Sequence, residues 1–183
     1  MKLFTSAKRV EKMASLMEIA RKNMNKFSSV SQEIATTYFG IESLHKIQLD
    51  AMEAFISGKH VMVNAPTGFG KSLIFQMMPY VVDSLTNSLL GNSVIIVVSP
   101  LISLMMDQVN SLKAKGVCTC YLSEDISIDD IVTESGEVVP SVLYCSPEGS
   151  LNSTLWRKLL LDPSFKSVCI GVTVDEAHCI SSW

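Results

Sequence analysis

The stretch that decides the fold runs from His60 to Ser72 and reads HVMVNAPTGFGKS. Its first half, HVMVNA, is a short apolar run and predicts a buried strand. Its second half is a turn containing two glycines, and the residues that follow predict a helix that ends at about Met78, before Pro79. A strand, a glycine turn and a helix in this order begin an α/β fold.

Segments of the same kinds recur along the chain. A helix is predicted from about residue 45 to 57 and another from 103 to 115, with Gly58 and Gly116 suited to their left-handed ends. Strands that alternate with helices predict a doubly wound parallel sheet with helices on both faces. The further buried strands predicted are VIIVVS at 94–99, VCTCYL at 117–122, SVLYCS at 141–146 and VCIGVTV at 168–174.

The N-terminal segment has a different character. An apolar stripe at helical spacing runs from Val10 to Phe27, and Ser29 with Gln32 has the spacing of a capping box for a second helix. Residues 1–48 carry eight Lys or Arg and four Asp or Glu, although the whole chain has a net charge of −3. We therefore expect a basic helical segment at residues 1–36 and an α/β domain at residues 37–183.

Composition excludes several classes of protein. The longest apolar runs are about five residues, such as VIIVV, well below the roughly 18 residues of a membrane-spanning helix. The five cysteines include no pair of CxxC units and no histidine partner at zinc spacing. We therefore expect reduced thiols in an intracellular protein, no zinc site and no membrane contact. The acidic balance after residue 48 argues against a protein that grips nucleic acid through bulk charge.

The turn after HVMVN matches the phosphate loop GxxxxGK[ST], with Ala65 in place of the first glycine. Glycines at 68 and 70 let the backbone N–H groups point inward as a cradle for phosphates, next to the positive N-terminus of the following helix. Lys71 is then expected to reach the β- and γ-phosphates, and the Ser72 hydroxyl to hold Mg²⁺. The predicted nucleotide-contacting residues of this loop are Ala65, Pro66, Thr67, Gly68, Phe69, Gly70, Lys71 and Ser72.

Two acids, Asp175 and Glu176, directly follow the last predicted strand. Ligands of such sheets bind at the carboxyl ends of the strands, so these acids are expected to lie near the phosphate loop. We predict that Asp175 binds Mg²⁺ through water and that Glu176 orients and deprotonates an attacking water. The alternative is a solvated acidic turn with no chemistry.

Five segments resemble, in order and spacing, the RecQ family of superfamily 2 DNA helicases over residues 37–183. They are TYFGIESLHKIQ, APTGFGKS, VVSPLISLMMDQV, LYCSPE and DEAHCISSW. RNA helicases of the DEAD-box type would carry a PTRELA-type segment in place of SPLISL, and those of the DEAH-box type lack the upstream glutamine signature. The resemblance implies most of the first of two RecA-like motor domains, of P-loop NTPase fold, which uses ATP and Mg²⁺ and acts on single-stranded or duplex DNA.

The resemblance also implies roles for single residues. Gln48 matches the glutamine that reads adenine, and Phe39 with Gly40 matches the start of that motif and is expected to pack around the base. His45 stands where the family usually has arginine. A mostly neutral imidazole cannot form the forked pair of hydrogen bonds that a guanidinium group forms. His178 resembles the residue that relays the nucleotide state. Implied DNA contacts are Ser99, Pro100, Leu101, Ser103 and Trp183, the last at the start of an aromatic-rich loop.

In the family, further segments and a second RecA-like domain with an arginine finger follow the tryptophan. We therefore expect a truncated domain that binds Mg·ATP weakly, hydrolyses it slowly and does not unwind DNA by itself. An arginine finger contributes roughly 10³ to 10⁵ in rate in comparable enzymes. By resemblance, the whole protein would be a nuclear 3′ to 5′ helicase of recombination and repair. The oligomeric state is not indicated by the sequence.

Two other classes of function stay open. A P-loop kinase or nucleotide switch would need no second domain, but it gives no reason for the SPLISLMMDQV segment. A non-enzymatic regulator or decoy would use the basic N-terminal helix to bind a partner, and deletion of residues 1–35 in a pull-down would separate it from a motor.

Overall fold

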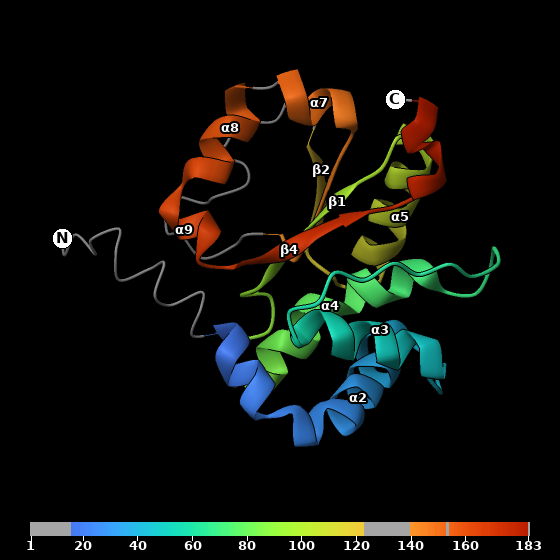
Figure 1. Ribbon diagram of the computed structural model, residues 1–183, viewed down its shortest axis with the longest axis vertical. Helices are drawn as coiled ribbons and strands as arrows, with labels where there is room; N and C mark the ends of the chain where they lie inside the picture. The colour runs from blue at the N-terminus through green and yellow to red at the C-terminus, as the bar shows by residue number, and fades with distance from the viewer. Residues whose placement is uncertain (1–15, 123–139, 153, 183) are drawn as a thin grey trace.

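Figure 1 shows the computed structural model, in which residues 16–122, 140–152 and 154–182 are described. Residues 16–22 are helical, and a 3₁₀ turn, η1 (Met24–Lys26), leads into the long helices. The helices are α2 (Phe27–Phe39), α3 (Lys46–Ile56), α4 (Lys71–Thr86), α5 (Ile102–Ala114), α7 (Pro147–Asn152), α8 (Thr154–Leu161) and α9 (Pro163–Lys166). The strands are β1 (Val94–Val98), β2 (Thr119–Leu122), β3 (Val142–Cys145) and β4 (Cys169–Val174), and a second 3₁₀ helix is η2 (Ala177–Ser182).

The four strands form one parallel sheet in the order β2-β3-β1-β4. The connection from β1 to β2 runs toward one edge of this sheet, whereas that from β3 to β4 runs toward the other edge. Right-handed crossovers therefore place α5 on one face and α7 to α9 on the opposite face. Figure 1 shows this division, with α2, α3 and α4 on the opposite side of β4 from α7, α8 and α9. The predicted α/β fold with helices on both faces is confirmed.

Alternating side chains of the strands divide the core into two buried clusters. Ile95, Val97 and Tyr144 point into the larger cluster, formed with α2 to α5. Ile96 and Leu143 point the other way, into a smaller cluster formed with α8 and α9. Trp156 is buried in the smaller cluster, where it packs as a core residue. Burial on both faces explains why these strands are continuous apolar runs.

The predicted strand at residues 60–65 is not formed. This segment pairs with no strand among the described residues, and two of its apolar side chains are open to solvent: Val61 is 39% and Met62 is 89% exposed. Within the described sheet β4 pairs only with β1, and Val172 and Val174 on β4 are exposed as well. A strand is stable when a neighbour satisfies its backbone N–H and C=O groups, so an apolar run alone did not suffice.

The predicted end of the helix before Pro79 is also wrong. Pro79 lies inside α4, which continues to Thr86. The eight residues after Met78 carry Tyr80, Val81 and Val82 into the larger core cluster. Their burial offsets the backbone hydrogen bond that a proline removes from a helix.

A buried carboxylate fixes the connection from α4 to β1. Both oxygens of Asp83 accept hydrogen bonds from backbone N–H groups, those of Gly91, Asn92 and Ser93, at 2.9 to 3.2 Å. Burial raises the pKa of Asp83 above its usual value, while these hydrogen bonds act in the opposite direction. The end of α4 and the start of β1 are thereby held together.

The N-terminal helices pack on the α/β unit. Phe27, Ile34 and Phe39 of α2 belong to the larger core cluster with α4, so the expected boundary at residue 36 falls inside a packed helix. The expected capping box of Ser29 and Gln32 is not formed, because α2 begins at Phe27 and the Gln32 amide instead bonds the backbone of residues 42 and 44. No helix in the described part of the chain is long and apolar enough to span a membrane.

All five cysteines are free thiols. Cys145 is buried and Cys118 is exposed. Burial raises the pKa of Cys120 to about 11 and that of Cys145 to about 12, so both thiols stay protonated at neutral pH.

Candidate nucleotide site

The phosphate loop owes its shape to two glycines. Gly68 has a φ of 82° and Gly70 a φ of 79°, a left-handed conformation that strains other residues. Gly70 is also the N-cap of α4, so Lys71 and Ser72 open this 16-residue helix. The N-terminal N–H groups of a helix have no intrahelical acceptor and favour anions, so the loop can bind phosphate.

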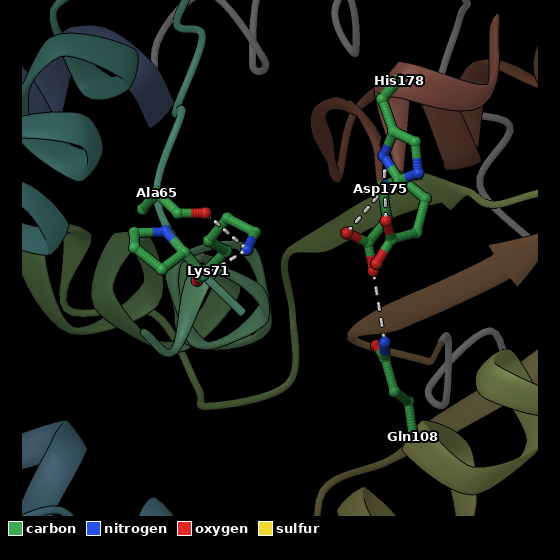
Figure 2. Close-up of polar contacts among 7 residues, drawn as sticks. Ala65, Lys71, Gln108, Asp175 and His178 are labelled. Carbon is green, nitrogen blue, oxygen red and sulfur yellow. Dashed lines mark hydrogen bonds and ion pairs between the residues drawn. The ribbon is translucent and has the colours of Figure 1, made fainter. Parts of the chain in front are cut away.

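Lys71 closes this loop on itself. Its Nζ donates to the carbonyl oxygens of Ala65 at 2.9 Å and Pro66 at 3.0 Å (Figure 2). Thr67 and Gly68, between these carbonyls and α4, are exposed. Phosphate oxygens carry more negative charge than carbonyl oxygens and form stronger charge-assisted hydrogen bonds with an ammonium group. The lysine is therefore in position to exchange its carbonyl partners for a phosphate.

Gln48 holds the loop from α3. Its side chain is buried, and its Oε1 accepts from the backbone N–H of His45 at 2.8 Å. Its Nε2 donates to the carbonyl of Gly70 at 3.1 Å and lies 3.4 Å from that of Phe69. Both ends of the amide are therefore engaged by protein groups.

His45 and Phe69 form a second link between α3 and the loop. The two rings stack at 4.8 Å between centroids with an interplanar angle of 26°. His45 is also the N-cap of α3, and its side chain completes a capping box with Gln48. The residue that replaces the family's arginine is thus part of the loop's support.

Phe39 lies elsewhere. Its ring is buried in the larger core cluster, edge-on to Tyr80 at 6.2 Å, with the Lys115 ammonium 5.8 Å from its centroid. Tyr80 is nine residues along α4 from Lys71, which is about 13 Å at the helical rise. The packing of Phe39 around the base stays a prediction. Gly40 caps α2 in the left-handed conformation.

Asp175 is held at the carboxyl end of β4. Its backbone N–H donates to the carbonyl of Val98 at 2.9 Å, and its side chain is nearly buried at 9% exposure. One carboxylate oxygen, Oδ1, accepts from the N–H of Glu176 at 3.0 Å, and the other, Oδ2, accepts from Nε2 of Gln108 at 3.2 Å (Figure 2). The sheet therefore presents this carboxylate with one defined orientation.

Glu176 and His178 lie just beyond the strand. Glu176 has a left-handed φ of 52°, which is uncommon outside glycine and costs backbone energy. Its Oε2 lies 3.2 Å from Nδ1 of His178, whose side chain is 76% exposed. The structure thus brings together the predicted base and the predicted relay residue.

Sequence analysis missed three polar residues behind Asp175. Gln108 of α5, Tyr144 of β3 and Gln76 of α4 bond to one another and, through Gln108, to Asp175. Gln108 lies within the SPLISLMMDQV segment, and this position was the sequence feature that could have marked it as a site residue. Long-range hydrogen bonds of this kind have no pattern in a single sequence.

The predicted DNA-binding segment follows β1. Ser99 is buried with 1% exposure, whereas Leu101 is 48% exposed and Ser103 is exposed at the start of α5. Pro100 is half-buried between them. Contact with a ligand from this segment is thus open to Leu101 and Ser103 rather than to the Ser99 hydroxyl. Trp183 lies outside the described residues.

Comparison with known protein families agrees with the family that the motifs suggested. A family model for the DEAD/DEAH box helicases matches residues 45–183. The chain belongs to this family.

Its relatives lie among the RecQ-type members, as the motifs indicated. The chain is 32% identical to an ATP-dependent DNA helicase RecQ of Haemophilus influenzae, over 82% of this chain and 22% of the relative. It is 35% identical to a probable ATP-dependent DNA helicase RecS of Bacillus subtilis, over 83% of this chain and 28% of the relative. With an ATP-dependent helicase wrn-1 of Caenorhabditis elegans the identity is 35%, over 80% of this chain and 13% of the relative. The chain thus matches between 13% and 28% of the length of these relatives.

A DEAD/DEAH box helicase uses ATP and Mg²⁺, and the residues present fit both. Mg²⁺ prefers oxygen ligands and is usually held by one or two carboxylates together with substrate phosphates. Ser72, half-buried in the first turn of α4, offers a hydroxyl, and Asp175 offers a fixed carboxylate. The N-terminus of α4 and the Lys71 ammonium are both positive, as binding of phosphate requires.

Proposed function

We propose that this chain is an ATP-binding motor domain of a RecQ-like DNA helicase. One observation carries the proposal: the phosphate loop opens α4 while the Asp175–Glu176 pair ends β4, in a parallel sheet of the helicase fold. Ligands of such sheets bind beyond the carboxyl ends of the strands. We further propose that residues 37–183 form this domain and that residues 1–36 are a basic N-terminal helical segment that contributes Phe27 and Ile34 to its core.

In the proposed site Lys71 exchanges the carbonyls of Ala65 and Pro66 for phosphate oxygens. The loop N–H groups at the start of α4 bind the same phosphates. Ser72 and Asp175 would hold Mg²⁺, which supplies compensation for the negative charge of the triphosphate. Glu176 orients the attacking water and accepts its proton. His178, whose ring contacts Glu176, relays the nucleotide state to the rest of the motor.

Adenine recognition is assigned to Gln48. An amide can donate to one adenine nitrogen and accept from the exocyclic amino group, which favours ATP over GTP. Because the two N–H groups of Gln48 Nε2 face the carbonyls of Gly70 and Phe69, adenine binding on this proposal requires one of these hydrogen bonds to be exchanged. The base would then be linked to the shape of the phosphate loop.

DNA binding is assigned to the segment after β1, with Leu101 and Ser103 as its exposed contacts and Trp183 as a stacking residue. We propose a 3′ to 5′ motor of DNA repair and recombination, nuclear in a eukaryotic cell. Motors of this kind close two domains around ATP, so this domain is proposed to work with a second RecA-like domain. Assayed alone, residues 1–183 are expected to hydrolyse ATP slowly and to separate no strands.

Titration with a fluorescent ATP analogue tests the nucleotide site. Lys71→Ala removes the ammonium that the loop offers to phosphate, and we expect its affinity to fall about 100-fold, since hydrogen bonds to charged groups contribute about 1.5 to 3 kcal/mol. Lys59→Ala is the matched control, because Lys59 is an exposed lysine next to the same segment. Equal affinities for the wild type and Lys71→Ala would refute the proposed role of the loop.

A further inference from the structure

Asp175 is the end of a chain of side-chain hydrogen bonds that crosses three other elements. Nε2 of Gln76 on α4 donates to the Tyr144 hydroxyl at 3.2 Å. The Tyr144 hydroxyl donates to Oε1 of Gln108 at 2.8 Å, and Nε2 of Gln108 donates to Oδ2 of Asp175 at 3.2 Å. Every donor in this chain points toward the carboxylate, and hydrogen bonds in such a series strengthen one another.

The order of donors and acceptors is fixed by the buried tyrosine. Tyr144 has 0% exposure, and burial raises the pKa of its phenol far above the usual value, so the hydroxyl keeps its proton at neutral pH. That hydroxyl donates to Oε1 of Gln108, and Nε2 of Gln76 donates to the same oxygen at 3.3 Å. The Gln108 amide is therefore oriented with its oxygen toward Tyr144 and its NH₂ group toward Asp175. The reverse orientation would set an oxygen against a carboxylate.

The carboxylate itself is left with little freedom. Its other oxygen, Oδ1, accepts from the N–H of Glu176, and its own backbone is bonded to β1. With one donor on each oxygen, the plane of the carboxylate is set, and the remaining lone pairs are directed away from Gln108 and Glu176. A metal ligand usually needs such outer partners to fix its orientation.

From these contacts we propose that Gln108, oriented by Tyr144 and Gln76, is the positioning residue for the Asp175 carboxylate. The proposal rests on the proposed function, in which Asp175 holds Mg²⁺. It gives α5 a part in the site, because Gln108 lies on the helix that has Leu101 as its N-cap and Ser103 in its first turn. It also ties the metal-binding acid to α4, the helix that opens with Lys71.

The test measures the Mg²⁺ requirement for binding of a fluorescent ADP analogue, and in parallel the affinity for the analogue in EDTA. Gln108→Ala removes the donor to Asp175, and Tyr144→Phe removes only the hydroxyl that orients Gln108. We expect both variants to raise the half-saturating Mg²⁺ concentration, Gln108→Ala by about 10-fold, as for other outer partners of metal ligands, and Tyr144→Phe by less. Affinity in EDTA is expected to stay unchanged.

Two controls separate positioning from general damage. Asn110→Ala changes an exposed polar residue of the same helix and is expected to leave the Mg²⁺ requirement as in the wild type. In an Asp175→Asn background, Gln108→Ala is expected to have no further effect, because its partner is already altered. Circular dichroism melting checks that each variant is folded, and Gln108→Ala carries the test should Tyr144→Phe fail to fold.

The outcomes distinguish the two proposals. Nucleotide binding with an unaltered Mg²⁺ requirement in Gln108→Ala would overturn the positioning role and leave the proposed function standing. The same 10-fold shift persisting in the Asp175→Asn background would also overturn it, since Gln108 would then act on something else. A wild-type chain that binds no nucleotide would overturn the proposed function, and the positioning role with it.

Discussion

The two halves of the candidate site are built in opposite ways. The phosphate loop, residues 65–70, is partly exposed and is held by its own glycines, by Lys71 and by two residues of α3. Asp175 is nearly buried, and its orientation depends on α5, β3 and α4. The loop can therefore change its partners when a ligand arrives, whereas the carboxylate is kept in place before any ligand binds.

Helix α3 joins the two halves. Gln48 and His45 near its start contact the loop, and Phe55 near its end packs on Gly171 of β4, the strand that carries Asp175. A change at either contact is expected to affect one half more than the other. The following substitutions test that division, in order of decreasing effect.

Gly171→Ala should cause the largest loss, on the side of the carboxylate. A Cβ at Gly171 would lie 2.6 Å from Cζ of Phe55, so the ring or the strand must move, and we expect about 2 kcal/mol of destabilisation, the usual cost of overpacking. Thermal unfolding followed by circular dichroism measures it. Phe55→Leu in the same chain should recover part of the loss, and a double variant no more stable than Gly171→Ala would show that the contact with Phe55 is not the cause.

Gly70→Ala should damage the loop. Its φ of 79° is strained for alanine by about 1 to 2 kcal/mol, and the new Cβ would lie 2.7 Å from Nε2 of Gln48. Gly68→Ala is a matched control, because Gly68 has a similar φ of 82° but no atom within 4 Å of its Cβ position. Nucleotide affinity should fall more in Gly70→Ala than in Gly68→Ala. Equal losses would mean that strain alone matters and that the Gln48 contact does not.

Gln48→Ala tests whether the same amide holds the loop and reads the base. Loss of adenine recognition should narrow the preference for an ATP analogue over a GTP analogue by about 1 kcal/mol, the usual net contribution of one hydrogen bond. Competition titrations with both nucleotides measure this preference. If both affinities fall by the same factor, Gln48 supports the loop and does not read adenine.

His45→Asn should have the smallest effect. Asparagine is a good N-cap residue and can keep the helix start, but it cannot stack on Phe69. Because aromatic pairs contribute about 0.5 to 1.5 kcal/mol, and His45 is exposed, we expect nucleotide affinity to fall about 2- to 3-fold with little change in stability. His45→Ala, which loses cap and stack together, should also lower the melting temperature. A fall in melting temperature of the same size in His45→Asn would assign the loss of stability to the missing stack on Phe69 and not to the cap.

Local patterns predicted most elements of this fold. The runs VIIVV, VLYC and CIGVTV became β1, β3 and β4, and the helices expected near residues 45–57 and 103–115 became α3 and α5. For β1 and β3 the reason is burial on both faces, which leaves a continuous apolar run in the sequence. CIGVTV does form a strand, but the prediction that it is buried was wrong, because Val172 and Val174 are exposed. Predictions failed where a local signal depended on a distant partner. HVMVNA lacks a paired neighbour, and the residues after Pro79 form helix because the core buries them.

The same division holds for the site. The sequence by itself determined which chemistry is proposed, since the phosphate loop and the acid pair are contiguous motifs whose residue types and spacing suit phosphate and magnesium binding. Only the tertiary structure decided which groups orient them: Gln48 against Gly70, Phe55 over Gly171, and Gln108 between Tyr144 and Asp175. These contacts join residues 22 to 116 positions apart. One sequence carries no period or spacing that relates residues brought together only by packing of the sheet and helices.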